Sequence, residues 1–241
     1  MDDAKTRTRR QILEAAAGIL EREGAQAVST RSVAAAAGIR AASLYQLFGD
    51  KDALLAALAV HGFGLYLAEK HELAPTGDPV ADLRRGWDLH VGFGLRHPAF
   101  YVLMFGTDRP GRRAPAAQEA HDLLLRFLSR VADAGRLRVP ALTAAGLLHS
   151  GVTGVTLSLI GAPAADRDPE ISARMRDTLI GSLTTDPPPV TDPSLAARAL
   201  ALDAALDAAE EAAEGASEGA ALPLRPAETA LLRDWLNQLA R

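Results

Sequence analysis

The sequence predicts an all-α protein in which a small N-terminal helix-turn-helix domain precedes a larger helical domain. Three observations lead to this prediction. Alanine, the strongest helix former, occupies 49 of the 241 positions, whereas aromatic residues make up only 5%. Apolar residues recur with helical spacing, and no long segment alternates with the two-residue period of a half-buried strand. Two short helical segments near the N-terminus are joined by a turn that contains glycine.

Three helices are predicted within the first 48 residues, at 6–23, 30–37 and 40–47. The first carries an apolar stripe with helical spacing, formed by Ile12, Ala16, Ile19 and Leu20. Gly24 and Gly38 follow the first and second helices, where glycine commonly ends a helix. Either Ser29 or Thr30 can cap the second helix. Two short helices across a glycine turn, braced by a longer first helix, predict a helix-turn-helix unit.

Eight further helices are predicted downstream, at 51–72, 80–96, 98–105, 116–134, 141–160, 169–183, 193–214 and 226–240. Asp50 can cap the first of them. The most strand-like window, Val152–Ile160, lies in an apolar segment whose length favours a buried helix. A loop is expected at 106–115, a stiff proline-rich linker at 184–193 and a flexible linker at 215–225. We expect a helix-turn-helix domain at residues 1–62 and a helical domain at 63–241.

Composition and charge restrict the class of protein. The chain has no cysteine, which excludes disulfides and thiol nucleophiles and is typical of a reducing cytoplasm. No stretch approaches 18 consecutive apolar residues, so no membrane span is expected, and the N-terminus lacks the pattern of a signal peptide. The net charge is −4, yet residues 1–51 carry +2 and the remainder −6. A basic N-terminal segment followed by an acidic remainder is compatible with a small DNA-binding module attached to a larger domain.

A motif follows the predicted turn. Leu44 and Tyr45 form a pair, Phe48 comes three residues after the tyrosine, and Lys51 opens the next helix. Together with the helical pattern of residues 8–39, this arrangement resembles the DNA-binding domain of the TetR family of bacterial transcriptional regulators. The resemblance implies a recognition helix that enters the major groove of an operator, and a C-terminal domain that dimerises and binds a small effector.

Two later segments are similar to the ligand-binding domain of one TetR subgroup, which is named after Trp, His and Gly. The better match is at 96–106. The match near His149 is looser, because Ser150 interrupts the usual His-Gly pair and no tryptophan precedes it.

Candidate DNA-binding residues lie on the exposed side of the third helix and beside it: Thr30, Arg40, Ala41, Ala42, Ser43, Tyr45, Gln46 and Lys51. Gln46 suits adenine and Arg40 suits guanine, while the two alanines offer only methyl groups. Hydroxyls and Lys51 can hold phosphates, and Thr30 can also cap its helix. Alternatively, Tyr45 simply packs, and Gln46 and Lys51 are solvated surface residues. Arg7, Arg9 and Arg10 form either a DNA-binding arm or a disordered tail.

Candidate effector-binding residues share apolar, aromatic or imidazole side chains in the second domain: Trp87, His90, Phe100, Tyr101, Met104, Phe105, His121 and His149. Methionine and aromatic residues line adaptable pockets. The alternative is that they are ordinary core residues and that the histidines are satisfied by the backbone. No histidine pair has the spacing of a metal-binding helix, and no nucleophile or dinucleotide motif is present. We therefore expect no metal, cofactor or enzymatic activity.

The sequence is thus interpreted as a homodimeric regulator, a repressor that a small apolar or amphipathic effector releases from a near-palindromic operator. The alternatives are a constitutive DNA-binding regulator and an enzyme that uses the helical cavity. Helices 141–160 and 169–183 are the candidates for dimerisation, because Gly146, Gly151 and Gly154 would allow close approach of helices. Gly62 and Gly64 mark either a soft point in the connecting helix or a site of close packing.

Overall fold

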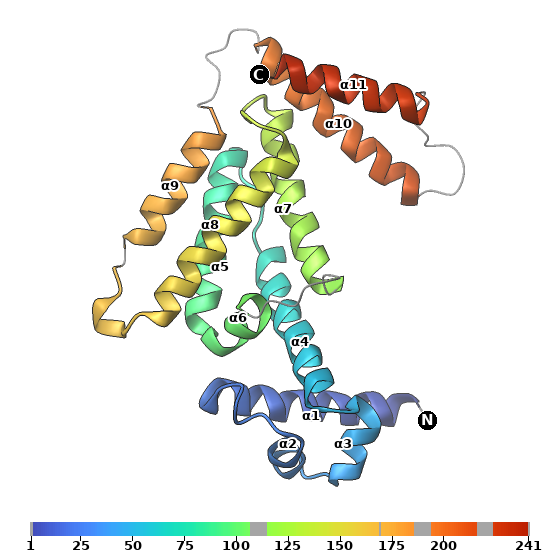
Figure 1. Ribbon diagram of the computed structural model, residues 1–241, viewed down its shortest axis with the longest axis vertical. Helices are drawn as coiled ribbons and strands as arrows, with labels where there is room; N and C mark the ends of the chain where they lie inside the picture. The colour runs from blue at the N-terminus through green and yellow to red at the C-terminus, as the bar shows by residue number, and fades with distance from the viewer. Residues whose placement is uncertain (1, 107–114, 169, 186–193, 216–223, 241) are drawn as a thin grey trace. The chain divides into compact units, whose positions relative to one another are not determined.

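The computed structural model describes residues 2–106, 115–168, 170–185, 194–215 and 224–240, which form eleven α-helices and no β-strand (Figure 1). The all-α prediction is therefore confirmed for this part of the chain. The helices are α1 (Asp2–Glu23), α2 (Thr30–Ala36), α3 (Ala41–Phe48), α4 (Lys51–His71), α5 (Pro79–Arg96), α6 (Pro98–Phe105), α7 (Pro115–Asp133), α8 (Ala141–Gly161), α9 (Ile171–Leu183), α10 (Leu195–Gly215) and α11 (Pro226–Leu239), with a 3₁₀ turn at Ala164–Asp166.

The helix boundaries agree with the predicted ones to within a few residues, and the largest difference is at the start of α1. The strand-like window lies inside α8 and is helical, as expected. Of the predicted loop and the two predicted linkers, residues 107–114, 186–193 and 216–223 lie outside the described residues.

The chain divides into two compact units. One consists of residues 1–73, 89–120 and 153–168, and the other of residues 74–88, 121–152 and 169–241. The first contains the three N-terminal helices, and α4 runs through residue 62 without a break. The core of this unit continues from the N-terminal helices into α4 and α6: its buried members are Ile12, Ala16, Ile19, Leu20, Val28, Val33, Ala34, Ala37, Leu44, Phe48, Leu54, Leu58, Phe100 and Leu103.

Local contacts fix the helix-turn-helix geometry. Gly38 has a φ of 65°, a conformation that glycine adopts without a steric penalty. The amide of Gln11 donates to the carbonyl of Ala37 over 2.8 Å and ties α1 to the end of α2. Ser29 caps α2 in a capping box with Ser32, with both hydrogen bonds at 3.0 Å. The cap is therefore Ser29, and the capping role predicted for Thr30 is wrong.

A buried carboxylate organises part of the second unit. Asp82 is 1% exposed, accepts hydrogen bonds from the Thr76 hydroxyl at 2.7 Å and from Arg130 at 2.9 Å, and pairs with Arg85. Burial by itself raises the pKa of Asp82, but the bonds from Thr76 and Arg130 outweigh it and lower the pKa. This carboxylate therefore stabilises the fold above its unfolded pKa of about 4, and the contribution is lost as the pH falls through the lowered value.

Helices α10 and α11 pack as a hairpin on Ala199, Leu206 and Leu236. The Arg233 guanidinium pairs with three carboxylates of α10, which belong to Asp203, Asp207 and Glu210. Outside this contact, α11 exposes an apolar stripe with four-residue spacing: Leu231, Trp235 and Leu239.

Two helices, α4 and α8, are long and apolar enough to cross a membrane when only length and composition are considered. Core helices of globular proteins pass the same test, and about a third of each apolar window is buried (33% in α4 and 39% in α8). In α4, Leu54 and Leu58 belong to the core described above, so this helix has a role within the fold.

Candidate nucleic-acid interface and buried polar cluster

The exposed side of α3 carries the side chains predicted to face DNA. Tyr45 is 52% exposed, and Arg40, Ala41, Ala42 and Gln46 are exposed as well. The opposite side of the helix is anchored in the core by the buried Leu44 and Phe48, with Leu47 and Ser43 half-buried at the margins. Burial of one side therefore fixes which residues the helix presents to a partner.

Two of the predicted residues meet across the helix-turn-helix. The hydroxyls of Thr30, at the start of α2, and Tyr45, on α3, lie 3.2 Å apart. One of them donates to the other, which leaves one O–H group able to donate to an outside acceptor such as a phosphate. The two hydroxyls therefore lie side by side on the exposed surface.

The N-termini of α3 and α4 differ in how they are capped. Arg40 is the N-cap of α3 and makes no side-chain capping bond, so backbone N–H groups of the first turn are left for an external anion. At α4, the carboxylate of Asp50 accepts from the Ala53 N–H at 2.7 Å. Lys51 follows as the first residue of α4 and is half-buried.

The arginines near the N-terminus lie on α1, which begins at Asp2. The alternative of a disordered tail for Arg7, Arg9 and Arg10 is therefore wrong. Arg10 pairs with Glu14 at 3.7 Å, whereas the Arg9 guanidinium lies 4.5 Å from the centre of the Phe48 ring. Arg9 and Arg10 therefore contact different neighbours.

A buried hydrogen-bonded chain forms the polar centre of the first unit. His90 is 5% exposed, and its Nδ1 lies 2.8 Å from the Tyr66 hydroxyl while its Nε2 lies 2.6 Å from the Tyr101 hydroxyl. A neutral imidazole has one N–H and one acceptor nitrogen, so one tyrosine accepts and the other donates. The chain joins α4, α5 and α6 through side chains that are all less than 9% exposed.

Aromatic rings enclose this polar centre. Phe93 lies 5.4 Å from Tyr66, and Phe105 lies 4.7 Å from Tyr101 and 5.3 Å from His90, measured between ring centres. Burial raises the pKa of Tyr101 to about 12, and burial followed by the nearby Tyr101 raises that of Tyr66. Both phenols are therefore neutral hydrogen-bonding groups at physiological pH.

Lys70 lies one helical turn after Tyr66, with its ammonium 5.4 Å from the centre of the tyrosine ring. Burial lowers the pKa of Lys70 from 10.5 to about 7. The unfolded chain then binds more protons than the folded protein between these two pH values, so Lys70 makes folding more favourable as the pH rises across that interval.

The structure brings together only some of the predicted effector-binding residues. His90, Tyr101 and Phe105 belong to the buried polar chain and its aromatic wall. Phe100 and Met104 pack against the core that the N-terminal helices share. The other three predicted residues belong to the second unit: Trp87, His121 and His149. There, the Trp87 indole N–H donates to the Ser172 hydroxyl at 3.0 Å.

Sequence reasoning missed Tyr66 and Lys70. Both lie on the predicted helix 51–72, and their spacing of four residues places them on the same face. A usable signal was the rarity of tyrosine: the chain has three, and the structure places each at a candidate site. Their proximity to His90 depends on how α4 packs against α5, which no local pattern encodes.

Helix α6 contacts two different clusters of side chains. Tyr101 and Phe105 contact His90, whereas Phe100 and Leu103 belong to the core that also contains Leu44 of α3. Both sets of side chains lie on the same eight-residue helix. Helix α6 therefore links the buried polar chain to the core that contains Leu44 of α3.

Gly62 allows this close approach of α6 to α4. A Cβ atom at Gly62 would lie 2.8 Å from the Met104 sulfur and 2.8 Å from a ring carbon of Phe100, whereas a Cβ at Gly64 would meet nothing within 4 Å. Of the two alternatives for these glycines, close packing describes the surroundings of Gly62.

We predict that Gly62→Val destabilises the protein by about 1–3 kcal/mol, because the added methyl groups overfill the α4–α6 contact. Gly64→Val, two residues away on the same helix, is the matched control and is expected to change stability by less than half as much. Chemical denaturation of both variants measures the difference. Equal losses would show that the contact with α6 is not what constrains Gly62.

The exposed face of α8 carries small residues at four-residue spacing: Gly146, Ser150, Gly154 and Ser158. A Cβ at Gly146 or Gly154 would meet nothing within 4 Å, so both are open to a second molecule. Gly151 is different, because its Cβ would collide with Leu179 of α9 and lie 3.5 Å from Trp87. The close approach at Gly151 is thus within the subunit, contrary to the role expected for it.

Within the described part of the chain, no three histidine, aspartate or glutamate side chains gather closely enough to hold a metal ion. The buried polar chain consists of two phenols and an imidazole that bond to one another, and the Thr156 side chain also hydrogen-bonds to Tyr101.

Comparison with known proteins gives two family matches. The model described as bacterial regulatory proteins of the tetR family matches residues 12–58, and the model described as a tetracyclin repressor-like C-terminal domain matches residues 83–183. No curated protein sequence matches significantly. Residues after 183, which include α10 and α11, lie outside both matches.

Solved structures show the same fold. A protein of unknown function from Rhodococcus sp. RHA1 is 29% identical, with 74% of this chain and 96% of that chain covered and a TM-score of 0.58. A putative tetR family regulator from Shewanella sp. PV-4 is 16% identical, with coverages of 74% and 99% and a TM-score of 0.58. TetR-Q116A from Acinetobacter baumannii AYE, solved with minocycline, is 23% identical, with coverages of 71% and 93% and a TM-score of 0.54.

Proposed function

The chain belongs to the TetR family of bacterial transcriptional regulators, and from that premise we propose that it is a homodimeric repressor released from its operator by a small amphipathic effector. It is a regulator and not an enzyme. The observation that carries the effector response is the double role of α6, which joins the buried polar chain to the core beneath the recognition helix. We also propose a cytoplasmic location, because a regulator must share a compartment with the operator that it binds.

For DNA recognition, α3 enters the major groove and presents Gln46 and Arg40 to base edges. The Thr30–Tyr45 hydroxyl pair, Ser43 and Lys51 hold phosphates on either side. Ala41 and Ala42 leave room for methyl contacts only, so few bases are read directly. In a dimer the two recognition helices reach successive major grooves, which places half-sites about 34–36 Å apart.

Replacing Lys51 with alanine is expected to weaken binding to all DNA sequences by a similar factor and to reduce the salt dependence by about one unit of slope. Gln46→Ala is the matched comparison, because it removes a proposed base contact without changing charge. It should alter the ranking of operators while leaving the salt slope unchanged. Fluorescence anisotropy at several salt concentrations measures both. A change of sequence preference in Lys51→Ala with an unaltered slope would contradict these assignments.

For the effector, the buried chain of Tyr66, His90 and Tyr101 supplies donors and acceptors, and the aromatic rings supply apolar contact area. This combination fits a mostly apolar molecule with one or two polar groups. The similar structure from Acinetobacter baumannii was solved in complex with minocycline. Met104 remains a candidate effector-binding residue in the first unit. Trp87, His121 and His149 remain separate candidates in the second unit. Membership of the subgroup named after Trp, His and Gly is likewise proposed from residues 96–106.

An effector that displaces Tyr101 would move α6 and, through Phe100, the core of the DNA-binding helices. Its binding and operator binding would then oppose each other by a coupling free energy of about 1–3 kcal/mol, equal in both directions. The dimer is proposed to form on the exposed face of α8, where small residues permit close approach. Helix α9, which exposes Ile171 and Met175, is the second candidate.

The decisive test begins with selection of the preferred duplex from a random DNA pool, followed by a screen of amphipathic compounds for release of the protein from that duplex. The expected result is a near-palindromic operator and at least one compound that weakens binding reciprocally. Selection of an operator without any responding compound would indicate a constitutive regulator.

A further inference from the structure

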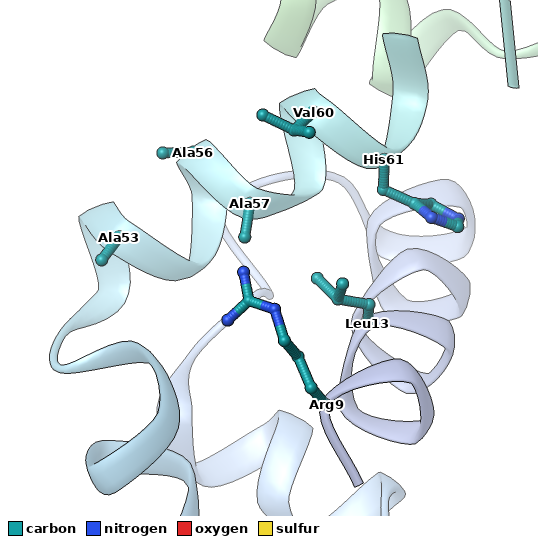
Figure 2. A pocket seen from close by; sticks show the side chains of 7 residues that line it. All are labelled: Arg9, Leu13, Ala53, Ala56, Ala57, Val60 and His61. Atoms are coloured by element: carbon teal, nitrogen blue, oxygen red, sulfur yellow. The ribbon is translucent and has the colours of Figure 1, made fainter. Parts of the chain in front are cut away.

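A groove in the N-terminal part of the first unit is separate from the residues assigned above to the operator and the effector (Figure 2). It has a volume of about 490 Å³ and lies between α1 and α4. Helix α1 contributes Arg9 and Leu13, and α4 contributes three alanines, Val60 and His61. The volume is within the range of small-molecule sites, about 300–1,000 Å³.

The groove exists because α4 has short side chains on this face. Ala53, Ala56 and Ala57 present only methyl groups, and Val60 is 46% exposed although it is apolar. Leu13 lines the groove from α1. The walls are therefore almost entirely hydrocarbon, and water in the groove is released when an apolar molecule fills it.

Arg9 gives the groove its charge. Figure 2 shows its guanidinium reaching from α1 toward Ala57 of α4. Arg9 is the one arginine or lysine among the lining residues, which include no carboxylate. In the described part of the chain no carboxylate pairs with Arg9, whose one hydrogen bond is a long contact of 3.5 Å to the Leu47 carbonyl.

We propose that this groove binds a monoanion with an apolar body, such as a carboxylate attached to an alkyl chain. The anionic group would accept hydrogen bonds from the Arg9 guanidinium, which is suited to bidentate recognition of carboxylates. The apolar body would lie along the alanine methyls and Val60, with its far end near His61. Charge complementarity selects an anion, since the lining contains no acidic residue to attract a cation.

Such a ligand would act directly on the recognition helix. Arg9 contacts the Leu47 carbonyl and lies over the Phe48 ring, and these are the last two residues of α3. Drawing the guanidinium toward a bound carboxylate weakens both contacts. The groove is thus a second ligand site, located in the DNA-binding helices and independent of the buried polar chain.

The test is methyl NMR of the full-length protein, labelled at alanine, valine and leucine methyls and titrated with decanoate. Decyltrimethylammonium, with the same chain and the opposite charge, is the matched ligand control. We expect decanoate to shift the methyl signals of Ala53, Ala56, Ala57 and Val60, and the cation to leave them unchanged. Because no DNA and no effector are needed, the result does not depend on the proposed operator or effector response.

Two variants separate the charge from the cavity. Arg9→Gln removes the cation and should weaken decanoate binding by about fivefold, a modest factor because the groove is open to solvent, whereas Arg9→Lys should retain most of the affinity. Ala57→Leu fills the groove while the positive charge of Arg9 is retained, and should abolish the shifts. Equal shifts with both ligands, shifts confined to other methyls, or unchanged affinity in Arg9→Gln would each overturn the proposal.

Discussion

Replacing His90 with leucine is expected to lower the free energy of unfolding by about 2–4 kcal/mol. His90 bonds to the hydroxyls of both Tyr66 and Tyr101, and it is the hydrogen-bond partner the structure gives for the Tyr66 hydroxyl. Leucine has a similar volume but no polar atom, so it leaves that buried hydroxyl without its partner. The cost of an unsatisfied buried group exceeds the net value of the bond itself.

The control is a second substitution in the same protein. Adding Tyr66→Phe to His90→Leu removes the stranded hydroxyl, and the double variant should recover at least about 1 kcal/mol relative to His90→Leu alone. Urea denaturation of the single and double variants gives the coupling. If Tyr66→Phe brought no recovery, the Tyr66–His90 bond would not be a stabilising element of the fold.

Gly154→Glu is expected to produce a monomer and to weaken operator binding by about 100-fold or more. The exposed α8 face is proposed to meet the same face of a second subunit, and a carboxylate buried at such a contact would have no partner. A monomer holds only one half-site and loses about half of the phosphate contacts. Sedimentation measures the assembly state, and anisotropy with the selected operator measures the affinity.

Two glycines of this chain serve as controls for that substitution. Gly64→Glu also places a carboxylate at an exposed helical position where a Cβ meets nothing within 4 Å, and should leave the dimer intact. Gly151→Glu would instead collide with Leu179 inside the subunit and reduce stability. An intact dimer in Gly154→Glu would exclude this face of α8 from the interface.

The features predictable from the sequence are those that depend on neighbouring residues. The glycine turn at Gly38, the Asp50 cap and the burial of Leu44 and Phe48 follow from local spacing, and the structure contains all of them. The choice between Ser29 and Thr30 as a cap could not be made, because it depends on the reciprocal bond with Ser32. The local pattern thus predicts where the helices begin and end. The choice between two adjacent capping residues depends on side-chain geometry.

The buried polar chain shows where such reasoning ends. His90 and Tyr101 were candidates because of their residue types, yet Tyr66, the second tyrosine that bonds to His90, lies 24 positions before it on another helix. The sequence also could not distinguish Gly62 from Gly64, because both are glycines on the same helix. Only the structure shows that Gly62 faces Phe100 and that Gly64 does not. The Tyr66–His90 bond and the packing at Gly62 both depend on contacts between distant segments. The pattern of a single sequence does not show which distant segments meet.

Helix α4 carries Lys51 at its first residue and Tyr66 and Lys70 near its last turn. Its 21 residues, at a rise of about 1.5 Å each, make a rod of about 31 Å. A tilt of about 5° about one end of such a rod displaces the other end by about 3 Å, which exceeds the tolerance of a hydrogen bond to a base or phosphate. If the proposed effector tilted α4 at the Tyr66 end, Lys51 and the helices packed on Leu54 and Leu58 would therefore shift enough to break the proposed DNA contacts.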